Sequence, residues 1–233
     1  MLISHRYKFI FIKTKKTAGT SIEIALSRYL GPDDVITHIS PEDEVLRAAP
    51  EYRGPQRFFV PWRSVSLAEW EQWLRTRQRP YFYNHMPARD IRARLPANIW
   101  NSYFKFCLER NPWDKVVSWY FWEHKSMPRP SLSEFIRAGR AAELATEGGG
   151  GLYTIDGQVA VDSIYRYEAL EQAMADLAAR VGLPEVPRLP RAKSRFRTDR
   201  RPFQELYDPE ARELVAAAFA REIALLDYRF EPG

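Results

Sequence analysis

The chain has 233 residues, of which 45% are hydrophobic and 14% aromatic, so it suits one globular domain and is not disordered over most of its length. Its formal net charge of +5 is a modest basic excess that suits an anionic ligand without identifying it. A single cysteine, Cys107, excludes an intrachain disulfide and a cysteine-based metal site, and its apolar neighbours predict a buried core position. No segment approaches the ~20 apolar residues of a membrane-spanning helix, and we expect a cytoplasmic protein.

The first predicted element is a strand over Lys8–Lys13, where Phe and Ile alternate with other residues. Apolar residues at helical spacing then predict a helix that starts at Thr20 and ends at a Gly-Pro pair. The Pro- and charge-rich region over about residues 32–80 is predicted to be an insert of loops and helices. Its two expected helices cover Pro41–Arg47 and Ser66–Arg77, the second with a serine cap.

A second strong strand is predicted over Tyr103–Glu109. Asn111 is a favoured N-cap and Pro112 a favoured first helical residue, so a helix is expected from there to about Lys125. The remaining predicted elements are a short helix over Asp90–Leu95, a helix over Ser131–Arg140, a strand over Val159–Tyr167, a helix over Ala169–Val181 and a last helix from Asp208-Pro209. Strands that alternate with helices predict an α/β domain with a largely parallel sheet.

Two segments of biased composition interrupt this pattern. The run GGGG at 148–151 lacks an adjoining lysine and a convincing preceding strand, so it is predicted to be a mobile surface connection rather than a phosphate cradle. The segment RLPRAKSRFRTDRR, Arg188–Arg201, forms a basic loop over about 188–203. A basic loop of this kind contacts an anionic ligand, binds a membrane or nucleic acid, or is simply solvated.

The turn between the first strand and its helix is rich in lysines and hydroxyls. A helix N-terminus presents unpaired N–H groups and the positive end of the helix dipole, which together favour an anion. Gly19 permits close approach of the backbone to a ligand, Thr20 and Ser21 supply hydroxyls, and Lys16 supplies a charge. Because Lys16 precedes the glycine by three residues, the Walker pattern is absent, which disfavours an ATPase or kinase of that type. A plain basic surface turn is the alternative.

A second anion site is predicted after the second strand. Arg110 ends that strand, and Ser118 follows eight residues later on the next helix. In a parallel sheet Arg110 reaches the same edge as the first turn, where a guanidinium fork and a hydroxyl can clamp a phosphate. The alternative is an arginine that closes the sheet edge and a serine that only packs.

Together the two sites resemble the sulfotransferase family. FIKTKKTAGTSI resembles the 5′-phosphosulfate loop, which typically reads F-I-H-I-P-K-T-A-G-T-S in the branch that includes the carbohydrate sulfotransferases. ERNPWDKVVSWY resembles that branch's 3′-phosphate motif, R-N-P-x-[DE]-R-x-x-S-x-[YF], and DSIYRYEAL and IALLDYRF are similar to its later segments. This chain departs from the pattern at Lys13 and Lys15, where the family has His and Pro.

The resemblance implies a three-layer α/β/α, P-loop-like sulfotransferase fold with a central, mainly parallel sheet, as one domain over 1–233. It implies a metal-independent enzyme that transfers a sulfuryl group from 3′-phosphoadenosine 5′-phosphosulfate (PAPS) to a hydroxyl or amine of a carbohydrate or glycoconjugate and releases 3′-phosphoadenosine 5′-phosphate (PAP). Lys16 would be catalytic at the leaving oxygen. The implied donor-binding residues are Lys15, Lys16, Thr17, Ala18, Gly19, Thr20, Ser21, Arg110, Ser118, Lys193, Arg195 and Arg197.

The acceptor must lose a proton, and His85 in YFYNHMPARD is the favoured base because similar G-H-x-P segments lie between the donor motifs of this branch. We expect YFYNH to form a short strand that ends near the cleft. His38 and Glu23 are the alternative bases, and a purely structural His85 is a further alternative.

Two other functions stay open, a non-catalytic anion- or nucleotide-binding module and a nucleotide phosphotransferase. The acceptor is also open among a sugar, a lipid, a natural product and a tyrosyl peptide. Trp62, Trp70 and Trp73 either stack on it or pack internally. No nucleic-acid partner is expected, and the sequence leaves the oligomeric state open.

Overall fold

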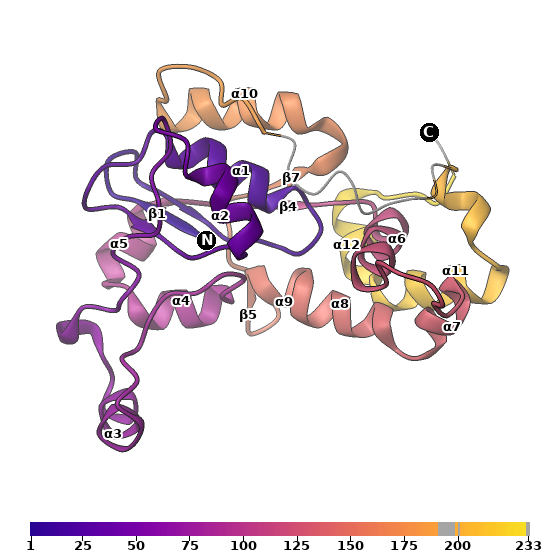
Figure 1. Cartoon of the computed structure of the whole chain (residues 1–233), viewed down its shortest axis with the longest axis horizontal. Helices are drawn as coiled ribbons and strands as arrows, with labels where there is room; N and C mark the ends of the chain where they lie inside the picture. The colour runs from indigo at the N-terminus through magenta and orange to yellow at the C-terminus, as the bar shows by residue number, and fades with distance from the viewer. Residues whose placement is uncertain (191–198, 200, 232–233) are drawn as a thin grey trace.

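The structure is a computed structural model, which describes residues 1–190, 199 and 201–231 (Figure 1). Its main sheet has five strands in the order β3-β1-β2-β4-β7. These strands are β1 (Leu2–Ser4), β2 (Phe9–Phe11), β3 (Val35–Ile36), β4 (Phe104–Glu109) and β7 (Ser163–Arg166). A separate hairpin pairs β5 (Thr154–Ile155) with β6 (Gln158–Val159).

Strand direction follows from the pairings. β2 and β4 pair in parallel, as do β4 and β7, whereas β1 is antiparallel to both of its neighbours. Only β1 is therefore reversed within this sheet, so the sheet is mainly parallel, as predicted. The parallel arrangement of β2 and β4 brings the loops that follow them to one edge of the sheet.

Helices surround the sheet and form a separate group beside it. Their bounds are α1 (Gly19–Ser27), α2 (Pro41–Arg47), α3 (Leu67–Thr76), α4 (Ala88–Arg94), α5 (Ala97–Ser102), α6 (Pro112–Glu123), α7 (Leu132–Arg137), α8 (Arg140–Gly148), α9 (Gly150–Tyr153), α10 (Leu170–Val181), α11 (Pro209–Ala218) and α12 (Ala220–Leu226). Short 3₁₀ turns cover η1 (Trp62–Ser64), η2 (Tyr167–Ala169) and η3 (Phe203–Leu206).

The alternation of side chains along β2 divides the core into two layers. Phe9 and Phe11 face the side covered by α1 and α10, where Leu26 and Met174 join them. Ile10 faces the other side, which α4, α5 and α9 cover. Helices thus flank the sheet on both faces (Figure 1).

A third apolar cluster lies among α6, α7, α8 and α11, which gather beside the sheet in Figure 1. Trp119 and Phe135 meet edge to face there, with ring centroids 5.5 Å apart. Helix α6 follows β4 directly, so it joins this helical group to the sheet. The pocket described below lies at that junction.

Local signals located most helices correctly. Asn111 caps α6 by accepting from the Trp113 N–H at 3.2 Å, and Asp208 caps α11 by accepting from the Ala211 N–H at 2.7 Å. Ser66 and Glu69 form a complete capping box at α3. The predicted last helix is divided into α11 and α12 at Phe219, which is fully buried.

Two sequence predictions were wrong. The GGGG run is not a mobile surface connection: it joins α8 to α9, and Gly148 and Gly150 are buried. The Gly150 N–H donates to the buried Glu222 carboxylate at 2.8 Å, so this tract belongs to the packed interior. YFYNH is not a strand, because only Tyr81 makes a bridge, to Phe59, before the chain turns at His85.

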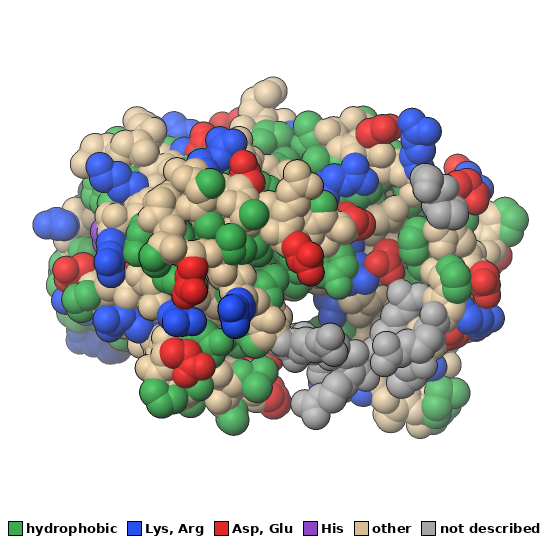
Figure 2. Space-filling model, turned by 90° about the horizontal axis from the view of Figure 1, so that it is seen from above, with side chains coloured by type: hydrophobic (Ala, Val, Ile, Leu, Met, Phe, Trp, Pro, Cys, Tyr) green, Lys and Arg blue, Asp and Glu red, His purple; other side chains and the backbone are tan. Residues whose placement is uncertain are grey.

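Cys107 is buried, as predicted. None of the helices in the described part of the chain is long and apolar enough to cross a membrane. On the face shown in Figure 2, basic and acidic side chains are interspersed, and the described residues of that face form no continuous basic stripe.

Candidate functional site: an anion pocket after β2 and β4

The loop between β2 and α1 has an unusual backbone. Lys16 and Ala18 both adopt left-handed conformations, with φ values of 63° and 60°. Left-handed residues that alternate with right-handed ones turn successive N–H groups toward one point and form an anion-binding nest. Ala18 is the N-cap of α1 and has no polar side chain, so it does not satisfy the first N–H groups of the helix. These donors and the positive end of the helix suit a phosphate or sulfate.

Hydrogen bonds from distant segments fix this loop. The Thr14 hydroxyl donates to the Leu108 carbonyl on β4 and lies 2.9 Å from the Thr17 hydroxyl. The Lys15 N–H donates to the Gly148 carbonyl at 2.8 Å, so the glycine tract also holds the loop. The loop is therefore preorganised rather than shaped by a ligand.

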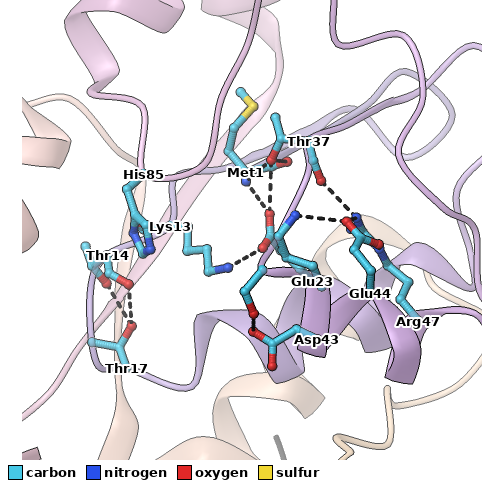
Figure 3. Close-up of polar contacts among 12 residues, drawn as sticks. Met1, Lys13, Thr14, Thr17, Glu23, Thr37, Asp43, Glu44, Arg47 and His85 are labelled. Atoms are coloured by element: carbon cyan, nitrogen blue, oxygen red, sulfur yellow. Dashed lines mark hydrogen bonds and ion pairs between the residues drawn. The ribbon is translucent and has the colours of Figure 1, made fainter. Parts of the chain in front are cut away.

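Gly19 has a specific steric role. A Cβ atom at this position would lie 2.6 Å from Lys13 Cγ, so only glycine leaves room for the buried Lys13 side chain to cross the start of α1. Lys13 thereby reaches the fully buried Glu23, which also pairs with the Met1 ammonium (Figure 3). Burial raises the pKa of Glu23, but the two ammonium groups outweigh it and lower that pKa to about 2. Lys13 therefore serves to anchor the loop.

Arg110 and Ser118 lie beside the loop, as the parallel strands predicted. Arg110 Nη1 donates to the Lys16 carbonyl at 3.3 Å, and its guanidinium carbon lies 4.3 Å from the centre of the Tyr167 ring. Asp114 accepts from Nε and Nη2 of Arg110 at 2.8 and 2.6 Å, which fixes the guanidinium plane. Ser118 is on the next turn of α6, four residues beyond Asp114.

The two motifs line one pocket of about 540 Å³. It is lined by Lys13, Thr14, Lys15, Lys16, Thr17, Ala18, Gly19, Thr20, Ser21, Ser40, Asn84, His85, Arg110, Ser118, Trp119, Trp122, Glu123, Arg140 and Tyr167. Five of these residues are cationic and one is a carboxylate. Lys13, Arg110 and Arg140 form ion pairs with carboxylates, but the lining still holds more positive than negative groups, which favours an anion. The predicted donor residues that fall in the described chain all belong to this set.

His85 also lines this pocket. It is half-buried and left-handed, with φ of 57°, and its Nδ1 lies 2.9 Å from the Lys13 carbonyl oxygen. A carbonyl only accepts, so Nδ1 carries the hydrogen and Nε2 of the neutral ring is left to accept a proton. Burial and the Lys13 ammonium lower the pKa of His85 to about 3, so the ring is neutral at pH 7.

The alternative bases do not line the pocket. The His38 side chain is 63% exposed and packs edge to face against Phe58. Glu23 is fully buried, and its carboxylate is engaged by the two ammonium groups described above. Of the three candidates, His85 alone borders the anion pocket.

Sequence reasoning missed several pocket residues. Trp122 has a sequence signal, because it lies four residues after Ser118 on the same face of α6, and its ring centre lies 5.1 Å from Lys16 Nζ. Arg140 has no such sequence signal, because it comes from the start of α8. Ion pairs with Glu123 and Glu143 hold its side chain in place. The basic-loop predictions, Lys193, Arg195 and Arg197, lie outside the described residues.

Side chains suited to a metal do not gather in the described chain. Over residues 1–190, 199 and 201–231, no group of three or more His, Cys, Asp or Glu residues is placed to hold a metal ion. The donors in the pocket are cationic and hydroxyl groups, which suit an anion.

The fold and the pocket define a class: an α/β protein with a fixed, lysine-rich loop and a pocket at a strand-to-helix junction. No family model matches the chain. A protein of Archaeoglobus fulgidus is 36% identical over 105 residues, which span 43% of this chain and 85% of the archaeal one. This chain therefore belongs to the same family as that protein, whose description, "Uncharacterized protein", assigns no activity.

Among solved structures, the crystal structure of mouse sulfotransferase SULT7A1 complexed with PAP is similar to this chain. The alignment has 14% sequence identity and a TM-score of 0.49, and it covers 97% of this chain and 87% of the mouse chain. Similarity at this level does not by itself assign a fold or an activity.

Proposed function

We propose that this protein is a sulfotransferase that uses PAPS as its donor. The observation that carries the proposal is that two segments resembling the donor motifs, 91 residues apart between Gly19 and Arg110, line one cationic pocket. The fixed loop, its nest and the first turn of α1 suit the 5′-phosphosulfate. Arg110 and Ser118 suit the 3′-phosphate at the other motif.

The reaction that follows uses position and charge. The acceptor oxygen forms a new bond to sulfur while the bond from sulfur to the bridging phosphate oxygen breaks, and that oxygen leaves with the electron pair as part of PAP. Lys16 would stabilise the charge that develops on the leaving oxygen. Nε2 of His85 would take the proton that the acceptor hydroxyl releases.

The low pKa of His85 bears on this role. A pKa of about 3 keeps Nε2 unprotonated at neutral pH, but it also makes the ring a weak base. A bound donor would bring several negative charges close to the ring and oppose the effect of Lys13. The pKa of His85 in the loaded protein should therefore be higher than in the free protein.

The test is calorimetric titration with PAP and, separately, with ATP, in the absence of Mg²⁺. We expect PAP to bind at micromolar concentration, ATP to bind at least about 10-fold more weakly, and Arg110→Ala to lose most PAP affinity, because a charged hydrogen bond contributes about 1.5–3 kcal/mol. Arg75→Ala on α3 is the matched control, since Arg75 is exposed and outside the pocket. Equal binding of PAP and ATP would refute the proposal, and PAP binding without turnover on any acceptor would favour a non-catalytic nucleotide-binding module.

A further inference from the structure

A second cavity adjoins the anion pocket. Its volume is about 390 Å³, and it lies between the segment that leads into α4, the α8–α9 junction and the β5–β6 turn. His85 lines both cavities, with Nδ1 held by the Lys13 carbonyl. Any molecule in the second cavity therefore meets the donor pocket at the one histidine placed to accept a proton.

The two cavities differ in charge. The second is lined by two carboxylates, Glu147 and Asp156, and by one cation, Arg89. The Arg89 side chain is 74% exposed and its Nε pairs with Asp90 at 3.2 Å, so its charge is partly balanced from outside the cavity. The carboxylates thus dominate, and this cavity favours a neutral or cationic molecule where the first favours a polyanion.

Neither carboxylate is strongly engaged. The Glu147 side chain is 65% exposed, and its ion pair with Lys15 is long, at 3.8 Å. The structure gives Asp156 no hydrogen bond or ion pair with another described residue. Both groups keep lone pairs for a ligand, and an ammonium group is the donor that complements them best.

Asp156 lies in the turn of the β5–β6 hairpin. Asp156 and Gly157 have φ values of 49° and 73°, and they connect two strands in which Ile155 pairs with Gln158. Two successive left-handed residues make the tight hairpin turn in which Asp-Gly and Asn-Gly are favoured. The backbone at Asp156 therefore has the conformation of a two-residue hairpin turn.

Tyr83 adds an aromatic wall to the same cavity. Its ring is 36% exposed, and its hydroxyl donates to Asp90 at 3.4 Å. An aromatic face beside carboxylates is a favourable environment for an organic ammonium ion.

We infer that the second cavity binds the acceptor, and that the acceptor is a small polyol or amino alcohol with a protonated amino group held by Glu147 and Asp156. This inference rests on the sulfotransferase function proposed above, because it is the donor in the first pocket that makes the second an acceptor site. The ammonium is the recognition group, and the hydroxyl that reacts is the one presented to His85. A bound donor would add negative charge nearby and strengthen the attraction.

A ligand-observed NMR titration tests the inference with a matched pair of probes, D-glucosamine and D-glucose, with and without saturating PAP. Because a hydrogen bond to a charged group contributes about 1.5–3 kcal/mol, we expect glucosamine to bind about 10-fold or more tightly than glucose. The double variant Glu147→Gln/Asp156→Asn should remove this preference and leave PAP affinity within about twofold of the wild type. Asparagine tolerates the left-handed turn as well as aspartate does, so the hairpin should persist.

Glu51→Gln is the control, because Glu51 is exposed and lies outside both cavities. Equal binding of the two sugars, no binding of either, or an undiminished preference in the double variant would each overturn the inference. PAP binding is read in the same samples. If PAP binds and the amine preference is absent, only this inference fails; if the preference is present but PAP does not bind, the sulfotransferase function fails and the amine site stands.

Discussion

At the scale of single residues, the pocket is marked by backbone conformations that side-chain-bearing residues rarely adopt. Of the eight non-glycine residues with positive φ in the described chain, three line the anion pocket: Lys16, Ala18 and His85. Each such conformation costs on the order of 1–3 kcal/mol and persists only where surrounding contacts enforce it. The bonds from Thr14, Lys15 and His85 to distant carbonyls supply that enforcement. Strained backbone held at three positions of one cationic pocket supports a binding role for it.

Lys16 gives the first prediction at this scale. Its ammonium group lies 5.1 Å from the centre of the Trp122 ring, so in the free protein it is held at the pocket wall. Lys16→Ala should reduce turnover by about 100-fold or more, as the loss of one preorganised charge stabiliser does, while PAP affinity falls only a few-fold. Steady-state kinetics and calorimetry on the same preparation measure both quantities.

Lys125→Ala is the matched control for that experiment. Lys125 Nζ also faces the Trp122 ring, at 5.8 Å, but Lys125 does not line the pocket. If the two variants lost activity equally, the effect would come from Trp122 or from general charge, and Lys16 would have no special role.

His85 predicts a pH dependence of stability. Its pKa is about 3 in the folded protein against an ordinary value of 6.5, so between these values the unfolded chain binds more protons. His85 therefore lowers the free energy of unfolding progressively as the pH falls from about 6.5 toward 3, and has no such effect above that window. His85→Asn, which tolerates the left-handed backbone, should lose less stability than the wild type between pH 7 and pH 4.5.

Urea denaturation at the two pH values measures that difference. His38→Asn, which replaces an exposed histidine, should follow the wild type. An identical loss of stability in wild type and His85→Asn would show that His85 is not held neutral in the folded protein.

At the scale of elements, the glycine tract shows why helices α8 and α9 meet as they do. A Cβ atom added at Gly149 would lie 3.3 Å from Lys115 Nζ. A Cβ atom added at Gly150 would lie 2.4 Å from Glu222 Oε1. Lys115 and Glu109 form a fully buried ion pair with an N···O distance of 2.7 Å. The absence of side chains thus lets the helix junction approach a buried charged cluster, and the same tract binds the Lys15 N–H of the donor loop.

This arrangement predicts the effect of Gly151→Ala. The added Cβ would lie 1.9 Å from the Thr146 carbonyl oxygen, which is backbone and cannot rotate away. We expect a loss of about 2 kcal/mol or more in the free energy of unfolding, together with weaker PAP binding through the displaced donor loop. Chemical denaturation and calorimetry measure the two effects. Gly54→Ala, where nothing lies within 4 Å of the added atom, should change neither, and equal behaviour of the two variants would contradict the argument.

The helices and strands also show which elements can be predicted from the sequence and which cannot. Helices α3, α6 and α11 were predictable because capping residues act within three positions, and α2 was predicted with its observed bounds. The glycine tract was misread because its composition signals flexibility, whereas its partners Glu222 and Lys115 are distant in sequence. The two-residue strand β3 (Val35–Ile36) was not predicted, since so short a segment has no periodicity.

The residues of the candidate site also fall into two groups, those that local sequence predicts and those that only tertiary packing brings to the pocket. The shared position of the Lys13–Ser21 loop and Arg110 at one sheet edge was predictable because, in both segments, a strand, a turn and a helix follow in direct succession. Arg140 and Tyr167 reach the pocket only through tertiary packing, so no local pattern could identify them. The second cavity was unpredictable for the same reason, because its carboxylates come from α8 and the β5–β6 turn and its histidine from the segment before α4.

At the scale of the whole molecule, the anion pocket lies between the sheet with its covering helices and the helical group formed by α6, α7, α8 and α11. The sheet supplies the loop from Lys13 to Ser21, whereas the helical group supplies Trp122 and Arg140. The apolar clusters of the sheet and of the helical group are distinct, and the two parts are joined by α6, by the α8–α9 junction and by polar contacts. A ligand that contacts both parts should therefore raise the free energy of unfolding of the whole chain.

Ligand binding at this junction should appear in thermal unfolding. At a PAP concentration 100 times its Kd, binding adds about 2.7 kcal/mol to the free energy of unfolding. For a protein of this size that corresponds to a rise in Tm of roughly 5–10 °C. AMP, which lacks the 3′-phosphate that Arg110 and Ser118 are proposed to hold, should give a much smaller rise at the same concentration. Scanning calorimetry with PAP, AMP and no ligand compares the three. If AMP and PAP raised Tm equally, the 3′-phosphate would make no contact with Arg110. If PAP raised Tm in the wild type and in Arg75→Ala but not in Arg110→Ala, the 3′-phosphate would lie at the end of β4.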